Sequence, residues 1–249
     1  MAINVEGLTR SYGALTAVSD LSFTVAPGEI VGLIGPNGAG KTTTLRTLAG
    51  ILKPTAGRVL VDGHDLAAAP VEAKRRLAFM PDEPHLFEYL TVEEHLRLVA
   101  RIYTVADFEA RARVLIDELE LAGKERSLPG ELSRGMRQKV VIACGLVRDA
   151  SVLLFDEPLT GLDPIGIRRM RQTIVARGKA GAAILVSSHL LHLVEEVCTR
   201  VVIMAKGRKV ADGTVAELAA RADLAAAGSN LEEIFFSVTG HGAPQTPDR

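Results

Sequence analysis

The chain has 249 residues, of which 47% are hydrophobic and 24% charged, and 29 Lys and Arg against 30 Asp and Glu leave a net charge of −1. This balance excludes a disordered chain, and a nearly neutral chain is a poor candidate for binding nucleic acid through bulk positive charge. The mean hydropathy of +0.20 is high for a globular protein, but the longest apolar run, residues 140–147, is far shorter than the roughly 20 residues of a membrane-spanning helix.

The N-terminal part of the chain predicts strands and one helix. Hydrophobic and polar residues alternate over 3–9 and 19–25 as in half-buried strands, and 57–61 predicts a third strand, followed by an Asp-Gly turn. The apolar run 29–34 predicts a buried strand that leads into a glycine-rich loop, and 41–52 predicts the helix after it. We therefore expect antiparallel N-terminal strands followed by a parallel core.

The middle of the chain predicts helices. Thr91 is a predicted N-cap for a helix with one apolar face, and residues 107–121 predict a second amphipathic helix. Ser133 begins a third predicted helix, which runs to about Arg148. The predicted apolar edge of the second helix comprises Phe108, Val114, Leu115, Glu118 and Leu119.

The C-terminal part alternates buried strands with helices. Residues 152–155, 183–187 and 201–205 predict strands, with helices over 167–177 and 190–198 between them. Such alternation is typical of a mainly parallel α/β sheet. We therefore predict an α/β fold in which the helices at about 82–150 form an inserted α-helical subdomain beside an N-terminal antiparallel β subdomain. The domain spans 1–240, and the Gly- and Pro-rich tail 241–249 is predicted to be disordered.

Two cysteines, Cys144 and Cys198, lie in apolar helical patterns. We interpret them as small core residues of a protein in a reducing compartment. The first ten residues lack a basic segment followed by an apolar one, so no secretory signal is expected.

The glycine-rich stretch matches the pattern G-x-x-x-x-G-K-[ST] of a phosphate-binding loop. Backbone N–H groups of such a loop point at a polyphosphate, and the following helix adds its positive N-terminal end. Lys41 is expected to reach the β- and γ-phosphates and Thr42 to ligate Mg²⁺. A P-loop by itself fits kinases, GTPases and transport ATPases alike. The predicted nucleotide-binding residues here are Gly35, Pro36, Asn37, Gly38, Ala39, Gly40, Lys41, Thr42 and Thr43.

Two carboxylates follow the buried strand at 152–155. Ligands of a parallel sheet bind at the carboxyl ends of its strands, so Asp156 is expected beside the phosphate loop, where it suits Mg²⁺. Glu157 follows directly and could polarise an attacking water molecule. The alternative interpretation is a pair of solvated acids at a strand end.

The order of motifs resembles the nucleotide-binding domain of ATP-binding cassette (ABC) transporters over about residues 2–240. Leu132-Ser133-Arg134-Gly135-Met136 resembles the family's Leu-Ser-Gly-Gly-Gln signature, although taken alone it also fits an ordinary N-capped helix. Gly161-Leu162-Asp163 resembles its D-loop. His189 is similar to the switch histidine that contacts the γ-phosphate, and Tyr12 to the aromatic residue that stacks on adenine.

The resemblance implies a composite site, in which two domains meet head to tail and each signature covers the other's ATP. Ser133, Gly135 and Asp163 would then contact the nucleotide of the partner domain. Asp82 occupies the position where the family usually has a glutamine; it could approach Mg²⁺, but a carboxylate cannot donate hydrogen bonds as an amide does. Arg134 and Met136 also depart from the usual signature.

The resemblance implies a Mg²⁺-dependent ATPase whose catalytic residues are Lys41, Glu157 and His189, with ATP and Mg²⁺ as cofactors. It also implies a second nucleotide-binding domain, the same or different, and a separate transmembrane permease, which would hold this subunit at the cytoplasmic face of the cell membrane. The end segment 230–236 resembles subunits of ABC-2-type exporters, which favours export. Phe87, Tyr89 and Leu90 are apolar residues in a predicted loop, and they would either contact the permease or pack on the helical lobe.

Two other functions are compatible with a P-loop. A soluble ABC ATPase acting on nucleic acid or ribosomes typically has two cassettes or a long coiled-coil insertion, and this chain has neither feature. A P-loop kinase would leave the signature and His189 without a role.

Overall fold

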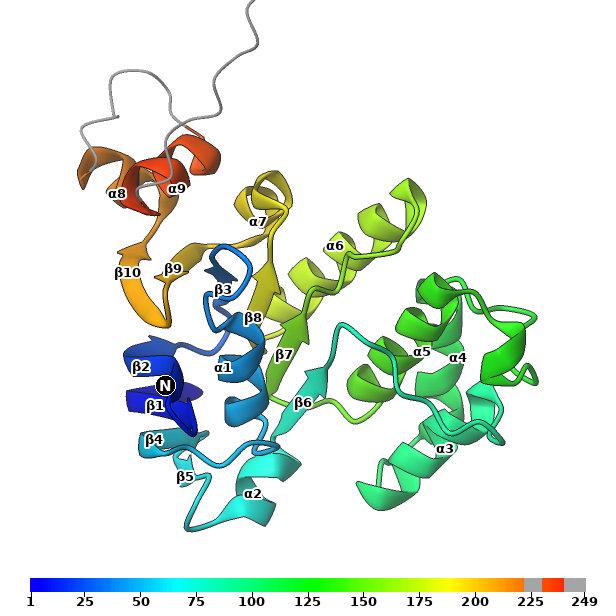
Figure 1. Ribbon diagram of the computed structural model, residues 1–249. Coiled ribbons are helices and arrows are strands. Elements are labelled where there is room, and N and C mark those ends of the chain that lie inside the picture. The colour runs from blue at the N-terminus through cyan, green and yellow to red at the C-terminus, as the bar shows by residue number, and fades with distance from the viewer. Residues whose placement is uncertain (222–229, 240–249) are drawn as a thin grey trace, which may run out of the picture.

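In the computed structural model, residues 1–221 and 230–239 are described, and they form two sheets and a lobe of helices (Figure 1). The smaller sheet is antiparallel and has the order β2-β1-β4-β5. Its strands are β1 (Ile3–Tyr12), β2 (Leu15–Val25), β4 (Ala56–Val61) and β5 (His64–Asp65). The predicted disordered tail at 241–249 lies outside the described residues.

The larger sheet has six strands in the order β10-β9-β3-β8-β7-β6, with β10 antiparallel to β9 and the other neighbours parallel. Every residue of β3 and β7 is buried, as expected of parallel strands that are covered on both faces. The strands are β3 (Ile30–Ile34), β6 (Leu77–Met80), β7 (Val152–Asp156), β8 (Ala183–Ser188), β9 (Arg200–Ala205) and β10 (Arg208–Gly213).

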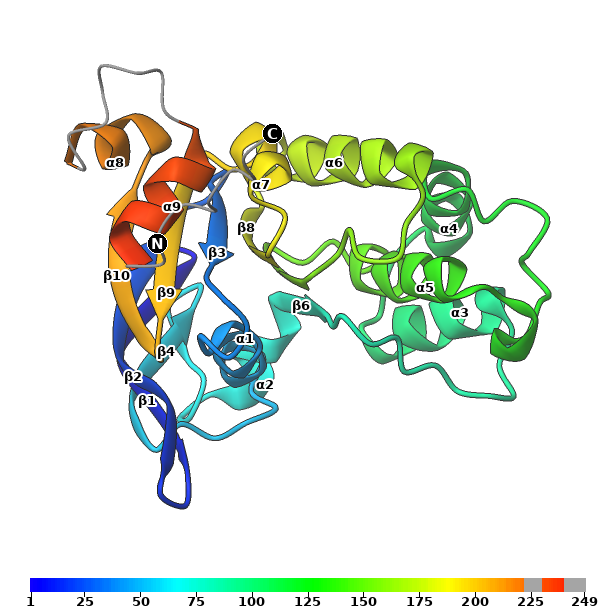
Figure 2. The same cartoon turned by 45° about the horizontal axis from the view of Figure 1, so that its top comes forward.

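Helices cover the larger sheet and form a lobe beside it. Figures 1 and 2 show α3, α4 and α5 together at one side of the molecule, with α6 extending from the sheet toward them. The helices are α1 (Lys41–Leu48), α2 (Pro70–Arg75), α3 (Val92–Ile102), α4 (Phe108–Glu118), α5 (Arg134–Leu146), α6 (Pro164–Lys179), α7 (Leu191–Val197), α8 (Val215–Arg221) and α9 (Leu231–Thr239), and a short 3-10 helix spans Pro129–Glu131.

The helical lobe shares its core with the sheet. One apolar cluster contains Leu96 of α3, Ile142 of α5 and Phe155 of β7, all fully buried. This continuity holds the lobe beside the edge strand β6, where the predicted site residue Asp82 begins the next loop. No helix among the described residues is long and apolar enough to cross a membrane.

Several predicted elements differ from the structure. Val114 was assigned to an apolar helix edge, but it is exposed, because α4 turns Ala112, Leu115 and Ile116 inward instead. The helix predicted over 167–177 begins earlier, at Pro164, since proline fits the first helical position and Asp163 caps it. The helix predicted over 41–52 ends at Leu48.

Candidate functional site

The glycine-rich loop joins β3 to α1 in a conformation that depends on glycine. Gly40 precedes α1 with a φ of 101°, a left-handed conformation that disfavours other residues. At Gly35, a Cβ atom would lie 2.4 Å from the carbonyl oxygen of Met204, so a side chain does not fit. The loop therefore requires glycine at both positions, and it leads into the N-terminus of α1, an end of a helix that favours anions.

Lys41 lies at the start of α1 with its side chain folded against the loop. Its Nζ donates to the carbonyl oxygens of Gly35 at 2.7 Å and Pro36 at 3.3 Å. Burial lowers the pKa of Lys41, and the negative charges of Glu157 and Asp156 only partly oppose this. The ammonium group is thus held close to the loop, within reach of a phosphate bound there.

Asp156 ends β7 beside the first turn of α1. Its Oδ1 accepts hydrogen bonds from Ser187 Oγ at 2.6 Å and Thr42 Oγ1 at 3.2 Å, and the residue is only 1% exposed. The carboxyl ends of β7 and β8 and the phosphate loop thus meet at one point, as the sequence predicts.

Glu157 and His189 face one another across the same sheet edge. Glu157 has a φ of 50°, an uncommon conformation for a residue with a side chain, and its N–H donates to the carbonyl oxygen of Ser187. His189 Nδ1 lies 2.8 Å from Glu157 Oε2. Because an ionised carboxylate only accepts hydrogen bonds, the ring proton of this contact is on Nδ1, which leaves Nε2 directed elsewhere.

An open cleft of about 740 Å³ brings most of the predicted nucleotide residues together. Tyr12 lies at one end of the chain's first hairpin, and the guanidinium of Arg10 stacks 4.5 Å from the centre of its ring. Tyr12 is 43% exposed, so part of its side chain is open to solvent. Predicted residues that line the cleft are Tyr12, Asn37, Gly38, Ala39, Gly40, Lys41, Thr42, Thr43, Asp82, Glu157 and His189.

Other residues of this cleft were missed by the sequence analysis. They come from the first hairpin, from the segment after Glu157 and from the turn between β9 and β10, which carry no phosphate-binding motif. Spacing relative to Tyr12 and Glu157 could have indicated those that are close to them in the chain, but not the residues of the β9–β10 turn. These residues are Leu15, Thr16, Ala17, Thr160, Lys206 and Gly207.

Ser133, Gly135 and Asp163 do not line the cleft that holds Lys41. Ser133 caps α5 by accepting a hydrogen bond from the N–H of Met136 at 3.2 Å. Asp163 caps α6 through the N–H of Gly166 at 2.7 Å. The signature and the D-loop do pack on each other, because a Cβ at Gly135 would lie 2.8 Å from the carbonyl oxygen of Gly161.

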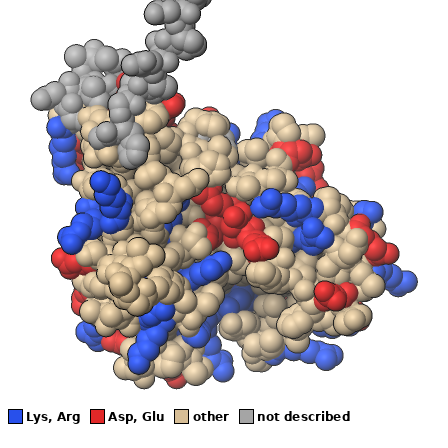
Figure 3. Space-filling view, in the orientation of Figure 1, with Lys and Arg blue, Asp and Glu red and all other residues tan. Residues whose placement is uncertain are grey.

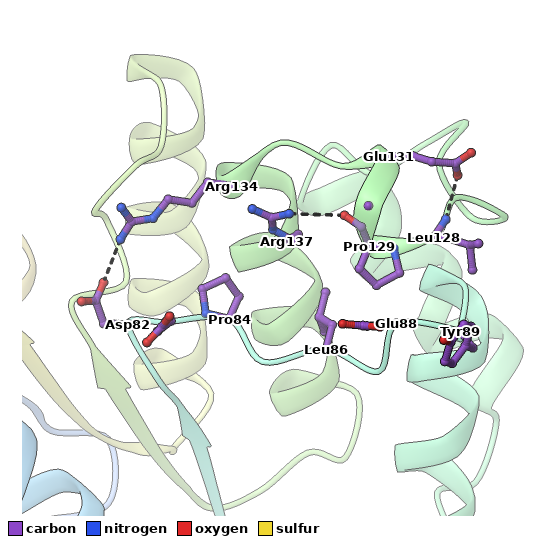
Figure 4. A pocket seen from close by; sticks show the side chains of 12 residues that line it. Asp82, Pro84, Leu86, Glu88, Tyr89, Leu128, Pro129, Glu131, Arg134 and Arg137 are labelled. Carbon is purple, nitrogen blue, oxygen red and sulfur yellow. Dashed lines mark hydrogen bonds and ion pairs between the residues drawn. The ribbon is translucent and has the colours of Figure 1, made fainter.

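A second cleft, of about 860 Å³, lies between the loop after β6 and the start of α5 (Figure 4). Asp82 lines both clefts. Its Oδ1 lies 3.8 Å from Arg134 Nη2, and one helical turn further on, Gln138 donates to the carbonyl oxygen of Pro81 at 2.9 Å. The first two turns of α5 thus contact the loop that reaches the nucleotide cleft.

The residues at the sheet edge fit a magnesium ion that is shared with a phosphate ligand. Within residues 1–221 and 230–239, no three His, Cys, Asp or Glu side chains come together as a metal cluster. Mg²⁺ commonly takes one or two protein oxygens and completes its shell with phosphate oxygens and water. Thr42 and Asp156 provide such oxygens beside the phosphate loop, and an ion there would neutralise charge on the phosphates.

Strand β3, the glycine-rich loop, the buried Lys41 and the adjacent Asp156 define a P-loop nucleoside triphosphatase. A model of the ABC transporter family matches residues 18–160. The ATP-binding protein EcsA of Bacillus subtilis is 33% identical over 97% of this chain and 98% of its own length. The chain therefore belongs to the ABC transporter family, as an ATP-binding and ATP-hydrolysing subunit.

Further relatives and solved structures agree. The Nod factor export ATP-binding protein I of Paraburkholderia xenovorans is 38% identical over 94% of this chain and 76% of its own. A solved ATP-binding subunit of an ABC transporter is 36% identical, with a TM-score of 0.91, and the match covers 96% of this chain and 100% of that one. The dimeric cassette MJ0796 with ADP and Pi, at 23% identity, 86% and 98% coverage and a TM-score of 0.79, shares the fold.

Proposed function

We propose that the chain hydrolyses ATP at two composite sites in a head-to-tail pair of cassettes and so drives a separate transmembrane subunit in export. One observation carries this proposal: the chain has a phosphate loop and a second helix tip suited to phosphate, at Ser133 and Gly135, yet only the loop lines the cleft of Lys41. A second cassette would supply the missing half of each site.

Within each site, we assign roles from the contacts at the sheet edge. The loop residues and Lys41 hold the phosphates, Thr42 and Asp156 hold Mg²⁺, and Tyr12 stacks on the base. Glu157 acts as the general base that activates water. His189, hydrogen-bonded to Glu157 through Nδ1, positions that carboxylate and directs Nε2 at the γ-phosphate. Asp82, which lines the same cleft, is the remaining candidate for the metal.

The paired arrangement is testable by mixing two inactive variants. Lys41→Met damages the phosphate loop, and Ser133→Arg damages the signature. In a head-to-tail pair of one of each, one site has both defects and the other has none. We expect each variant alone to be nearly inactive and the mixture to regain up to about a quarter of wild-type turnover, since half of the pairs are mixed and each has one intact site.

Two results would contradict the composite site. One is a mixture no more active than the two variants measured separately, under conditions where wild-type subunits exchange. The other is a loss of ATP binding by Ser133→Arg, which would place Ser133 in the same site as Lys41. A mixture of Lys41→Met with Lys41→Ala serves as the matched control and should stay inactive.

The direction of transport is inferred from relatives. Two of them are named as export ATP-binding proteins, for Nod factor and for the peptide SkfA. The SkfA relative, SkfE of Bacillus subtilis, is 36% identical over 84% of this chain and 88% of its own. We therefore propose export, with the cargo chosen by the transmembrane partner. Such an arrangement places this subunit at the cytoplasmic face of the membrane.

The loop after β6 supports a docking surface for that partner. Phe87 and Tyr89 are 64% and 87% exposed, and together with Leu90 and Leu98 they border an open apolar hollow. Large exposed apolar groups that gather in one place are typical of a protein interface. Of the two interpretations that the sequence allowed, the exposure of Tyr89 favours the partner, whereas the ring of Phe87 also stacks on His95 of α3, with the ring centres 6.0 Å apart.

Co-purification tests the partner. We expect the wild-type chain to be recovered from detergent-solubilised membranes with a polytopic membrane protein, and Phe87→Ser with Tyr89→Ser to lose it while keeping the ATPase activity of the isolated subunit. Val114→Ser, on another exposed face of the helical lobe, is the control. Recovery of ribosomes or nucleic acid instead would favour the soluble ATPase. On the described part of the face in Figure 3, basic and acidic side chains are interspersed.

A further inference from the structure

The turn between β9 and β10 is fixed against the phosphate loop. The N–H of Gly207 donates to the carbonyl oxygen of Ala39 at 3.1 Å, and the carbonyl oxygen of Gly207 accepts from the N–H of Ser19 at 2.8 Å. A Cβ at Gly207 would lie 2.8 Å from the carbonyl oxygen of Ala17. The turn therefore forms a corner between the phosphate loop and β2, and it is hydrogen-bonded to both.

This corner lies between the base-stacking and phosphate-binding ends of the cleft. The first hairpin pairs Tyr12 with Leu15 and Ser11 with Thr16, so Tyr12 is separated from the corner at Ala17 by only a short stretch of hairpin. On the other side, Ala39 leads directly to Gly40 and Lys41. A nucleotide with its base at Tyr12 and its terminal phosphates at Lys41 would thus extend along a cleft that this corner lines.

Lys206 immediately precedes Gly207 at this corner and lines the same cleft as Tyr12, Thr16 and Lys41. It has a φ of 48°, a conformation that asparagine or glycine adopts more easily and that often marks a functional position. Among the described residues, no carboxylate forms an ion pair with it, whereas Lys209 on the same hairpin pairs with Asp212 at 3.0 Å. Lys206 thus presents an uncompensated positive charge.

We infer that Lys206 is a further nucleotide-binding residue, whose ammonium group contacts the α- or β-phosphate of the bound nucleotide. The cleft's acidic residues, Asp82 and Glu157, come from the opposite side, at the ends of β6 and β7. A cation at the hairpin corner balances the phosphates that lie farthest from Mg²⁺ and Lys41. This inference depends on the proposed placement of the base against Tyr12.

The test is the affinity for ATP and ADP, measured with a fluorescent nucleotide at several salt concentrations. We expect Lys206→Met to weaken the binding of both nucleotides by about threefold to tenfold, the range of one exposed charged contact. The dependence of affinity on salt should also become shallower, because one charge has been removed. Lys206→Arg should retain most of the affinity, and Lys209→Met, the matched control, should bind as the wild type does.

Three outcomes would overturn the inference. Unchanged affinity of Lys206→Met would show that the ammonium group makes no contact, and a loss confined to ATP would assign it to the γ-phosphate instead. A loss with an unchanged salt dependence would mean that the turn itself had been disturbed. Tyr12→Ala keeps the two proposals separate: if it binds normally, the base is misplaced, whereas if it binds weakly and Lys206→Met does not, only Lys206 is wrong.

Discussion

The carboxylate of Asp82 and the guanidinium of Arg134 form an ion pair, with Oδ1 and Nη2 3.8 Å apart, between the loop after β6 and the first turn of α5 (Figure 4). Both are departures from the pattern that the family resemblance implies, and the structure places them together. Because Asp82 also lines the nucleotide cleft, its carboxylate could contact either Arg134 or a metal ion bound in that cleft.

We predict that substitutions can distinguish the contact of Asp82 with Arg134 from a contact of Asp82 with a metal ion. Both side chains are more than a third exposed, so losing the pair should cost less than about 1 kcal/mol of unfolding free energy. Asp82→Asn should raise the Mg²⁺ concentration required for half-maximal hydrolysis, whereas Arg134→Met should leave it unchanged or lower it. Titrations of turnover against Mg²⁺ measure this, and an equal increase in both variants would assign Asp82 to the ion pair alone.

Glu157→Gln should reduce ATP turnover by about 10²- to 10³-fold, the contribution of a general base, and leave nucleotide binding intact. The amide retains the size of the side chain and its contact with His189 but cannot take a proton from water. Steady-state hydrolysis and equilibrium binding measured together provide the check. Glu72→Gln, an exposed acid on α2, is the control, and normal turnover of Glu157→Gln would remove Glu157 from its role.

His189→Ala should lower kcat more than it raises KM for ATP. The substitution removes the 2.8 Å contact with Glu157 and, in the proposed arrangement, the group directed at the γ-phosphate, but it leaves the phosphate loop untouched. We expect a decrease in kcat of about tenfold or more. His85→Ala, an exposed histidine on the loop after β6, is the control. A change in KM with kcat preserved would make His189 a binding residue instead.

The site residues that belong to a local motif could be predicted from the sequence, whereas those that depend on contacts between distant segments could not. The phosphate loop is one continuous stretch, so Gly35 to Thr43 could be located from spacing, and Asp156 followed from its place at a strand end. The pairing of Asp82 with Arg134 joins residues far apart in the chain, and no local pattern announces it. Lys206 was missed for the same reason. The turn that carries it contains no local motif, and only its contacts with distant segments place it in the cleft.

The fold, too, was predicted well where a local pattern decides the structure and less well where packing decides it. Continuous apolar runs predicted β3, β7 and β8, since buried parallel strands need no alternation. The phase of α4 was wrong at Val114 because Ala112, a small residue with little hydrophobic weight, lies on the buried face. On α3, His95 is 4% exposed and accepts a hydrogen bond from the N–H of Phe87, a contact that helical spacing alone does not predict.

Lys41→Met should unfold no more easily than the wild type, and we expect it to be more stable although its binding of ATP is expected to be lost. Burial lowers the pKa of Lys41 in the folded state. The charged form of Lys41, which prevails at neutral pH, therefore destabilises the folded protein relative to the unfolded chain. This destabilisation is complete below the folded-state pKa and disappears above the unfolded-state pKa. Urea unfolding at neutral pH measures it, with Lys124→Met, at an exposed site, as the control. A clear loss of stability would mean that the hydrogen bonds to Gly35 and Pro36 outweigh burial.

Gly135→Ala should damage the contact between the signature and the D-loop. The added Cβ would lie 2.8 Å from the carbonyl oxygen of Gly161, which is backbone and cannot rotate away. Such overpacking costs about 1–3 kcal/mol, and the better helix propensity of alanine returns at most about 1 kcal/mol. We therefore expect a net loss of up to about 3 kcal/mol.

The same substitution should reduce hydrolysis and leave the affinity for ATP unchanged, because neither Gly135 nor Gly161 lines the cleft of Lys41. Gly130→Ala is the matched control, since a Cβ there meets nothing within 4 Å. Chemical unfolding, ATP binding and turnover of the two variants decide the matter. If Gly135→Ala were as stable and active as Gly130→Ala, the D-loop segment would have to move freely from α5, and the packing of these two segments could not be what positions the signature.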